Sequence, residues 1–173
     1  MAGHQGSVRE KRKLATRERI RAAAAELFTR HGYGAATMRQ IARRAHVGLG
    51  TLFNYAEDKR DLVFLIFNEE LNATTDEALA APRPSQALAG QLLAVFAVHY
   101  RWLAEKPALA RILLQELTFY SSGKQAATFH SIRQRLMDGI ESLVRKAVVI
   151  HCNRCIINCI HCNWNHNGIA KNW

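Results

Sequence analysis

The placement of proline most strongly constrains the fold of this chain. Only three prolines occur in 173 residues, at Pro82, Pro84 and Pro107, and alternating runs rich in Val, Ile and Thr are missing from the first 147 residues. Proline interrupts helices, and alternating β-branched runs are typical of strands. The sequence therefore predicts an all-α chain, and its apolar fraction of 49% is enough for a substantial core.

The first helix is expected to carry an apolar face from Ile20 to Phe28 and to end at His31. Gly32 suits the left-handed residue that follows a helix. The basic segment SVREKRKLATRERIR, which opens this region, is expected to be a solvated arm that leads into the helix.

The second helix is expected to begin after Thr37, which has capping-box spacing to Gln40. A short third helix is expected from about Leu49 to Tyr55. Asp58 is expected to cap a fourth helix, which ends before Pro82. Three further helical stretches are expected at residues 85–104, 107–120 and 125–149.

Lys and Arg outnumber Asp and Glu by 24 to 14, which gives a formal net charge of +10. Such a charge attracts polyanions, either nucleic acid or an anionic membrane surface. No window reaches the roughly 18 consecutive apolar residues of a membrane span, and the first residues lack the apolar core of a secretory signal. A cytoplasmic protein with no membrane partner is expected, and four cysteines confined to one short segment suit a reducing compartment.

The stretch GLGTLFNYAEDK, residues 48–59, has the character of a DNA-reading element. Two short helices joined by a glycine-containing turn form the helix-turn-helix, which places its second helix in the major groove. Gly48 and Gly50 leave room for close backbone approach, and Thr51 and Asn54 offer donors and acceptors for base edges. Each residue alone could equally belong to a turn, the surface or the core, but their combination with the net charge favours DNA.

The order of residues from Thr16 to Leu71 resembles the N-terminal domain of TetR-family transcriptional regulators. The resemblance lies in LFTRHGYGAATM at the end of the first helix, IARRAHVGLGTLFNY in the helix-turn-helix and DKRDL at the start of the fourth helix. It covers about a third of the chain. Two positions depart from the family pattern: Phe53 stands where tyrosine is usual, and Ala56 where phenylalanine is usual.

The resemblance implies a three-helix DNA-binding head over residues 13–73, joined by the fourth helix to a helical ligand-binding and dimerisation domain over residues 74–173. It also implies a homodimer that binds a palindromic double-stranded DNA operator, usually as a repressor. An unidentified small-molecule effector would release the DNA by moving the fourth helix. By position, the base-proximal residues are Leu49, Gly50, Thr51 and Asn54, and the phosphate contacts are Thr37, Arg39, Tyr55 and Lys59.

Aromatic residues in the C-terminal half could line an effector pocket that is apolar with a few polar groups. The same residues at helical spacing are more often ordinary core, and that alternative stays open. No acid–base pair or activated nucleophile has convincing spacing, so the sequence predicts a protein that is not an enzyme and uses no cofactor. The candidate pocket residues are Phe96, His99, Tyr100, Phe119 and Tyr120.

The composition changes after Ala147. Residues 148–173 contain no acidic residue and no leucine, but they hold all four cysteines, three histidines and six asparagines. Three interpretations are open: a shifted reading frame or altered terminus, a helix whose cysteines form one packing stripe, and a zinc or iron–sulfur site. The two CxxC pairs lie too close together for a good zinc-finger match. The residues concerned are His151, Cys152, Cys155, Cys159, His161, Cys162 and His166.

Two other functions compete with the ligand-responsive regulator. The Cys/His tail could make the protein a metal- or redox-sensing regulator, which bound metal would support. The charge could instead serve a basic nucleic-acid packaging protein, which would bind specific and random duplex DNA equally well.

Overall fold

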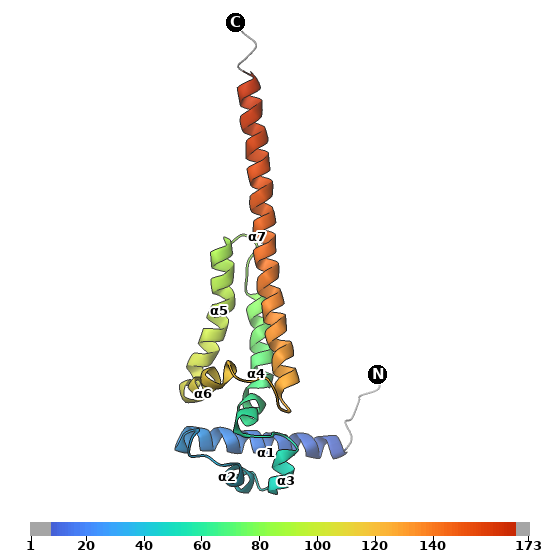
Figure 1. Cartoon of the computed structure of the whole chain (residues 1–173), viewed down its shortest axis with the longest axis vertical. Coiled ribbons are helices and arrows are strands. Elements are labelled where there is room, and N and C mark those ends of the chain that lie inside the picture. Colours follow the sequence, from blue (N-terminus) through green and yellow to red (C-terminus); the bar gives the residue numbers. More distant parts are fainter. Residues whose placement is uncertain (1–7, 169–173) are drawn as a thin grey trace.

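The computed structural model describes the backbone of residues 8–168 and the side chains of residues 8–149. All regular secondary structure in this part of the chain is helical, as the sequence predicts (Figure 1). No helix within it is both long and apolar enough to cross a membrane. The helices are α1 (Val8–His31), α2 (Met38–Arg44), α3 (Leu49–Phe53), α4 (Lys59–Ala80), α5 (Leu88–Glu105), α6 (Pro107–Leu117) and α7 (Ala126–Gly168).

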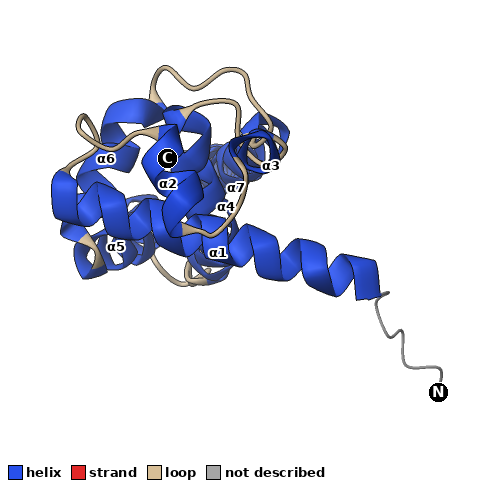
Figure 2. Cartoon of the chain, turned by 90° about the horizontal axis from the view of Figure 1, so that it is seen from below, coloured by secondary structure: helices blue, strands red, loops and turns tan. Residues whose placement is uncertain are grey.

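The first three helices form a head at one end of the molecule. α1 lies across the foot of α4, with α2 and α3 beneath it (Figure 1). Seen from below, the N-terminal half of α1 extends beyond the other helices (Figure 2). Burial of large apolar side chains, each worth about 1.5–3 kcal/mol, holds the head together. The buried side chains include Ile20, Phe28, Ile41 and Leu52.

Local side-chain chemistry sets the helix ends in the head. Gly32 follows the last residue of α1 with a φ of 79°. Thr37 Oγ1 accepts a hydrogen bond from the backbone N–H of Gln40 at 3.2 Å, and Gln40 Oε1 accepts one from the backbone N–H of Thr37 at 2.9 Å. Asp58 caps α4 by accepting from the backbone N–H of Asp61 at 2.7 Å. These sequence predictions are confirmed.

α4 is the central helix and is covered on all sides near its start. Residues 61–68 are all buried, so this part of α4 lacks the single apolar stripe of a surface helix. α4 packs against α1 in the head and against α5, α6 and α7 in the rest of the molecule. The expected boundary between residues 73 and 74 falls inside α4, which the head and the C-terminal helices share.

Two helix boundaries in the head differ from expectation. α1 already begins at Val8, so residues 8–21 of the basic segment expected as an arm are helical. α3 ends at Phe53 and not at Tyr55. The N–H groups of Asn54 and Tyr55 donate to carbonyl oxygens three residues earlier, which tightens the last turn and ends the α-helix.

α7 is longer than expected. The sequence predicts an end near Val149, whereas α7 continues to Gly168 and projects beyond α4 and α5 (Figure 1). No proline or glycine occurs between Gly139 and Gly168 to interrupt it. The side chains from residue 150 onward lie outside the described residues, and so do the cysteine stripe and the metal site. Among the described side chains, no cluster of His, Cys, Asp or Glu could hold a metal ion.

A buried carboxylate joins α4 to the loop between α6 and α7. Asp61 is 1% exposed, and its oxygens accept from the hydroxyl of Tyr120 and from the backbone N–H groups of Glu57, Lys124 and Gln125, the last three at 2.9 Å each. We refer to Asp61 and these four donors as the Asp61 clamp. Burial and the hydrogen bond to Asp61 raise the pKa of Tyr120, so its hydroxyl stays protonated. The donors offset the cost of burying a charge.

Gly123→Ala should destabilise the protein. Gly123 has a φ of 128°, and an added Cβ would lie 2.8 Å from Asp61 Oδ1. Backbone strain and displacement of the carboxylate should lower the free energy of unfolding by about 1–3 kcal/mol, measured by urea denaturation. Gly34→Ala is a matched control, because an added Cβ there meets nothing within 4 Å. A Gly123→Ala protein as stable as the wild type would contradict this account of the loop.

Candidate nucleic-acid interface

α3 is anchored to the head by one face and open to solvent on another. Leu52 in the helix is fully buried, and so is Ala56, which lies just beyond the end of the helix. Phe53, in contrast, is 42% exposed. A helix this short is held by packing, because few of its backbone hydrogen bonds can form on their own. Of the four residues expected to read bases, Leu49 is half-buried. The other three, Gly50, Thr51 and Asn54, are exposed.

Two expected phosphate contacts lie at the start of α2. Thr37 and Arg39 are both exposed at this end of the helix, where the backbone N–H groups and the helix dipole attract anions. The hydroxyl of Thr37 donates its proton to Gln40 Oε1 at 2.8 Å, so this proton is not free to bind a phosphate. Arg39 therefore supplies the positive charge at this position.

The other two expected phosphate contacts also hold the head together. Tyr55 donates its hydroxyl to the backbone oxygen of Lys13 in α1 at 3.2 Å. Lys59 donates Nζ to the carbonyl oxygens of Tyr33 and Gly34 at 2.9 and 3.1 Å, and Nζ lies 4.9 Å from the centre of the Tyr33 ring. Sequence reasoning missed these structural roles because both contacts join segments far apart in the chain.

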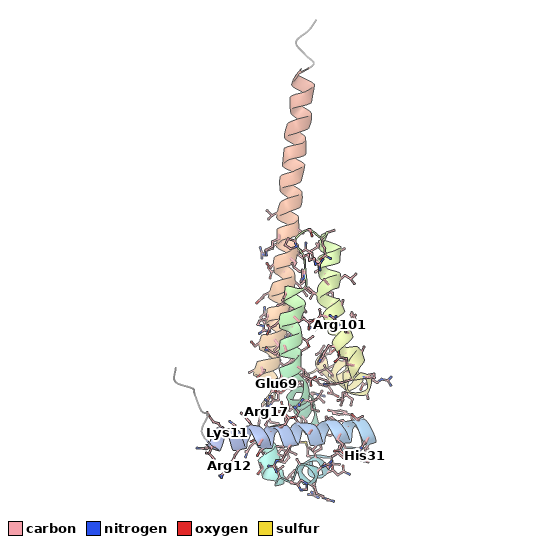
Figure 3. The ribbon with its side chains drawn as sticks, turned by 180° about the vertical axis from the view of Figure 1, so that it is seen from behind. Lys11, Arg12, Arg17, His31, Glu69 and Arg101 are labelled. Atoms are coloured by element: carbon pink, nitrogen blue, oxygen red, sulfur yellow. The ribbon has the colours of Figure 1, made fainter. Side chains whose placement is uncertain are left out.

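A basic groove lies beside the end of α3. It has a volume of about 570 Å³ and is lined by α1, the end of α3 and the loop between α6 and α7. Figure 3 shows Lys11, Arg12 and Arg17 along the N-terminal half of α1. This groove was not predicted, because the basic segment was expected to be an arm, although no proline or glycine there opposes a helix. The polar and charged lining residues are Glu10, Lys11, Lys13, Arg17, Asn54, Tyr55, Lys124 and Gln125.

A second cavity lies among α4, α5, α6 and α7. Its volume is about 280 Å³, and its walls are almost entirely apolar. His99 borders it, with Nε2 3.5 Å from Thr75 Oγ1 and Nδ1 3.1 Å from the backbone oxygen of Val95. The exposed residue Arg133 also borders it. The apolar lining residues include Leu71, Trp102, Leu113, Leu117, Phe129 and Ile132.

Only one of the five residues expected to line an effector pocket borders this cavity, namely His99. Phe96 and Tyr100 are 42% and 71% exposed, because the buried face of α5 carries Val95 and Val98 instead. Aromatic spacing within one helix does not reveal which face that helix turns inward. The expectation that the five side chains line one pocket is therefore corrected.

The early end of α6 explains why Phe119 and Tyr120 do not border the cavity. α6 ends at Leu117 and not near Tyr120, so the chain turns earlier than the sequence predicts. Phe119 is then 69% exposed, while Tyr120 turns inward, is 3% exposed and donates to Asp61. Tyr120 belongs to the Asp61 clamp and not to the cavity wall.

α2, the turn after it and α3, supported by α1, define the chain's head as a helix-turn-helix domain. Residues 20–66 match the family model described as "Bacterial regulatory proteins, tetR family". The N-terminal domain of this chain therefore belongs to the tetR family, as the order of its residues suggests.

Similarity to named proteins extends this result. The chain is 39% identical over 61 residues to the HTH-type transcriptional regulator HbdR of Aromatoleum sp. (strain CIB), a match that spans 35% of this chain but only 27% of HbdR. Among solved structures, it is similar to a tetR-family regulatory protein of Rhodococcus RHA1, with 27% identity, a TM-score of 0.57 and coverage of 79% of this chain and 71% of that one.

A further similar structure contains a bound molecule. It is FadR of Thermus thermophilus, a TetR-family transcriptional repressor solved in complex with lauroyl-CoA. The identity is 26% and the TM-score is 0.54, with coverage of 75% of this chain and 66% of that one.

Lys59→Ala should lower the stability of the head, since it removes two hydrogen bonds from a charged donor. Burial, and then the negative charges of Glu116 and Asp58, raise the pKa of Tyr33 to about 12, so the ring beneath Lys59 remains neutral. A loss of about 1–2 kcal/mol in the free energy of unfolding is expected from urea denaturation. Lys146→Ala, at an exposed position on α7, is the control. Equal stability of the two variants would contradict a structural role for Lys59.

Proposed function

We propose that this chain is a sequence-specific DNA-binding transcriptional regulator that acts as a homodimer on a palindromic operator and is released by a small molecule. The observation that carries this proposal is the exposed face of α3. Gly50 and Thr51 lie on it, the exposed residue Asn54 follows the helix directly, and Leu52 fixes the helix to the core. A rigid, accessible helix with polar groups of this kind fits the major groove.

The charge distribution supports the same proposal. Arg39 lies at the start of α2, which packs against α3, and the cations of the basic groove lie beside Asn54 and Tyr55, which follow α3. Cations that neutralise phosphates release condensed counterions, which supplies much of the affinity for DNA. We therefore assign Arg39 to phosphate binding and Asn54 to base reading; Thr37, Tyr55 and Lys59 stay predicted phosphate contacts.

The proposed effector is a molecule with an apolar chain and an anionic group. The cavity among α4 to α7 is close in volume to the lower end of small-molecule sites, which is about 300 Å³, and its walls are apolar. Arg133 could meet a negative charge at its edge. FadR of Thermus thermophilus, which binds lauroyl-CoA, supports an acyl thioester as the first molecule to test.

A dimer is supported by apolar side chains that the single chain leaves exposed. Leu93 and Tyr100 on α5 are 70% and 71% exposed, and Val144 and Val148 on α7 are 37% and 54% exposed. Burial of such residues against a second copy would bring two heads together, as a palindromic operator requires. The proposed place of action is the cytoplasm, where the operator DNA would lie.

Selection of bound sequences from random duplex DNA at physiological salt tests the DNA-binding proposal. A palindrome with half-sites about one helical turn apart, or a multiple of it, is expected for a dimer. Enrichment of no sequence, with equal binding to all duplexes, would favour a packaging protein instead. Stoichiometric metal in the purified protein, with metal-dependent DNA binding, would favour the metal-sensing alternative.

Asn54→Ala and Arg39→Ala should have different effects on binding to the selected operator. Asn54→Ala should reduce discrimination between operator and random duplex by about 1–3 kcal/mol, because a base contact is lost. Arg39→Ala should weaken binding to both duplexes equally and reduce the salt slope by about one. Fluorescence anisotropy over a salt series measures both. A folded Asn54→Ala protein with unchanged discrimination would overturn the assignment of Asn54.

Lauroyl-CoA should lower the affinity of the wild-type protein for its operator, and blocking the cavity should abolish this response. Leu114 borders the cavity and is 54% exposed, so Leu114→Trp can fill the entrance without adding volume to the core. Phe119→Trp is the matched control, because Phe119 is exposed and does not border the cavity. Operator binding is titrated with lauroyl-CoA for each protein. An unchanged response of Leu114→Trp would place the effector elsewhere.

A further inference from the structure

The loop between α6 and α7, residues 118–125, touches both the DNA-reading head and the cavity helices. Gln125 Nε2 donates to the backbone oxygen of Tyr55 at 3.0 Å, directly after α3. The backbone oxygen of Gln125 in turn accepts from Asn68 Nδ2 of α4 at 3.1 Å. Gln125 is therefore bonded to the segment that follows α3 and to the central helix α4.

The Asp61 clamp adds a second link between this loop and the head. Asp61 accepts from the N–H of Glu57, which lies between α3 and α4, and from Tyr120 and the N–H groups of Lys124 and Gln125 in the loop. The same carboxylate therefore holds the chain that leaves α3 and the chain that leaves α6. Neither segment can shift without removing a hydrogen-bond donor from the buried carboxylate of Asp61.

The other side of the loop is continuous with the cavity wall. α6 contributes Leu113 and Leu117 to that wall, and α7 contributes Phe129 and Ile132. The loop joins these two helices and is short. A molecule that separates α6 from α7 must therefore also displace the loop.

Ring packing connects the clamp to the same wall. Tyr120 stacks on Phe64 of α4 with ring centres 3.7 Å apart, and Phe64 lies 4.6 Å from Phe129 in the cavity wall. Close-packed rings of this kind transmit a displacement because they leave no space to absorb it. Tyr120 thus contacts the cavity wall through its ring and the head through its hydroxyl.

From these contacts we infer that Asp61, Tyr120 and Gln125 are positioning residues for DNA binding: they fix the orientation of α3 and couple it to the cavity through the loop between α6 and α7. The fixing of α3 follows from the free protein alone. The coupling to a bound molecule rests on the proposed function, in which the cavity holds the effector.

Amide hydrogen exchange of the free protein tests the first part. Tyr120→Phe keeps the ring but loses the hydroxyl, and Gln125→Ala loses the bond to Tyr55 while keeping its backbone bonds. Each variant should exchange the amides of residues 49–57 about fivefold faster than the wild type, as expected for loss of one hydrogen bond worth about 1 kcal/mol. Gln134→Ala on the exposed face of α7, where Gln134 bonds only Asp138 within the described contacts, is the control. Unchanged exchange at residues 49–57 in folded Tyr120→Phe and Gln125→Ala would overturn the inference.

Titration of the DNA complexes with lauroyl-CoA tests the second part. If the molecule lowers wild-type operator affinity by about tenfold, a usual size for coupling between sites, the two variants should retain only about twofold to threefold of this effect. The control should respond like the wild type. Full responses in both variants would overturn the coupling. A wild-type protein that binds DNA but ignores lauroyl-CoA would refute the proposed effector, while hydrogen exchange would still decide whether the loop positions α3.

Discussion

The arrangement of this molecule depends on one buried carboxylate. Asp61 lies in the first turn of α4, and its hydrogen-bond donors come from the segment after α3 and from the loop before α7. A buried charge without partners is strongly unfavourable, so these segments must stay together whenever the protein is folded. Hydrophobic packing alone would tolerate small shifts between them, because it is not directional. The carboxylate therefore supplies the directional constraint that packing lacks.

The central helix extends this constraint to the rest of the chain. Phe64 stacks on Tyr120 of the clamp, and Phe67 meets Trp102 of α5 edge to face at a ring-centre distance of 5.6 Å. Further along, Glu70 accepts from Lys106 at 2.7 Å and pairs with Arg21 of α1 at 3.4 Å. Within three turns, α4 thus contacts the loop before α7, α5 and α1. A division into two domains near residue 73 describes the proposed functions better than it describes the packing.

The sequence predicted features that depend on neighbouring residues. The capping box at Thr37, the cap at Asp58 and the left-handed Gly32 each involve groups within about one helical turn, so the local order of residues determines them. The tetR-type head was predicted for a related reason, because the residues that carry the resemblance lie in one continuous stretch from Thr16 to Leu71. The exposure of Gly50 and Asn54 follows from that pattern once Leu52 is buried.

The features that the sequence did not predict depend on distant residues. Lys59 binds carbonyl oxygens 25 and 26 positions away, and Tyr120 meets Asp61 across 59 positions. Residue type suggested a phosphate contact for Lys59 and a ligand contact for Tyr120, since nothing local identifies such partners. The orientation of α5 was hidden for the same reason: it is set by α4 and α7, and it leaves Phe96 and Tyr100 exposed.

The length of α7 would turn a small change of angle at its first residues into a large displacement of its far end. The helix starts directly after the Asp61 clamp and continues for 43 residues, which corresponds to about 65 Å at 1.5 Å per residue. If it turns as a rigid rod about its first residues, a tilt of only about 3° moves the far end by roughly 3 Å. α7 is then a lever with its fulcrum beside the DNA reader.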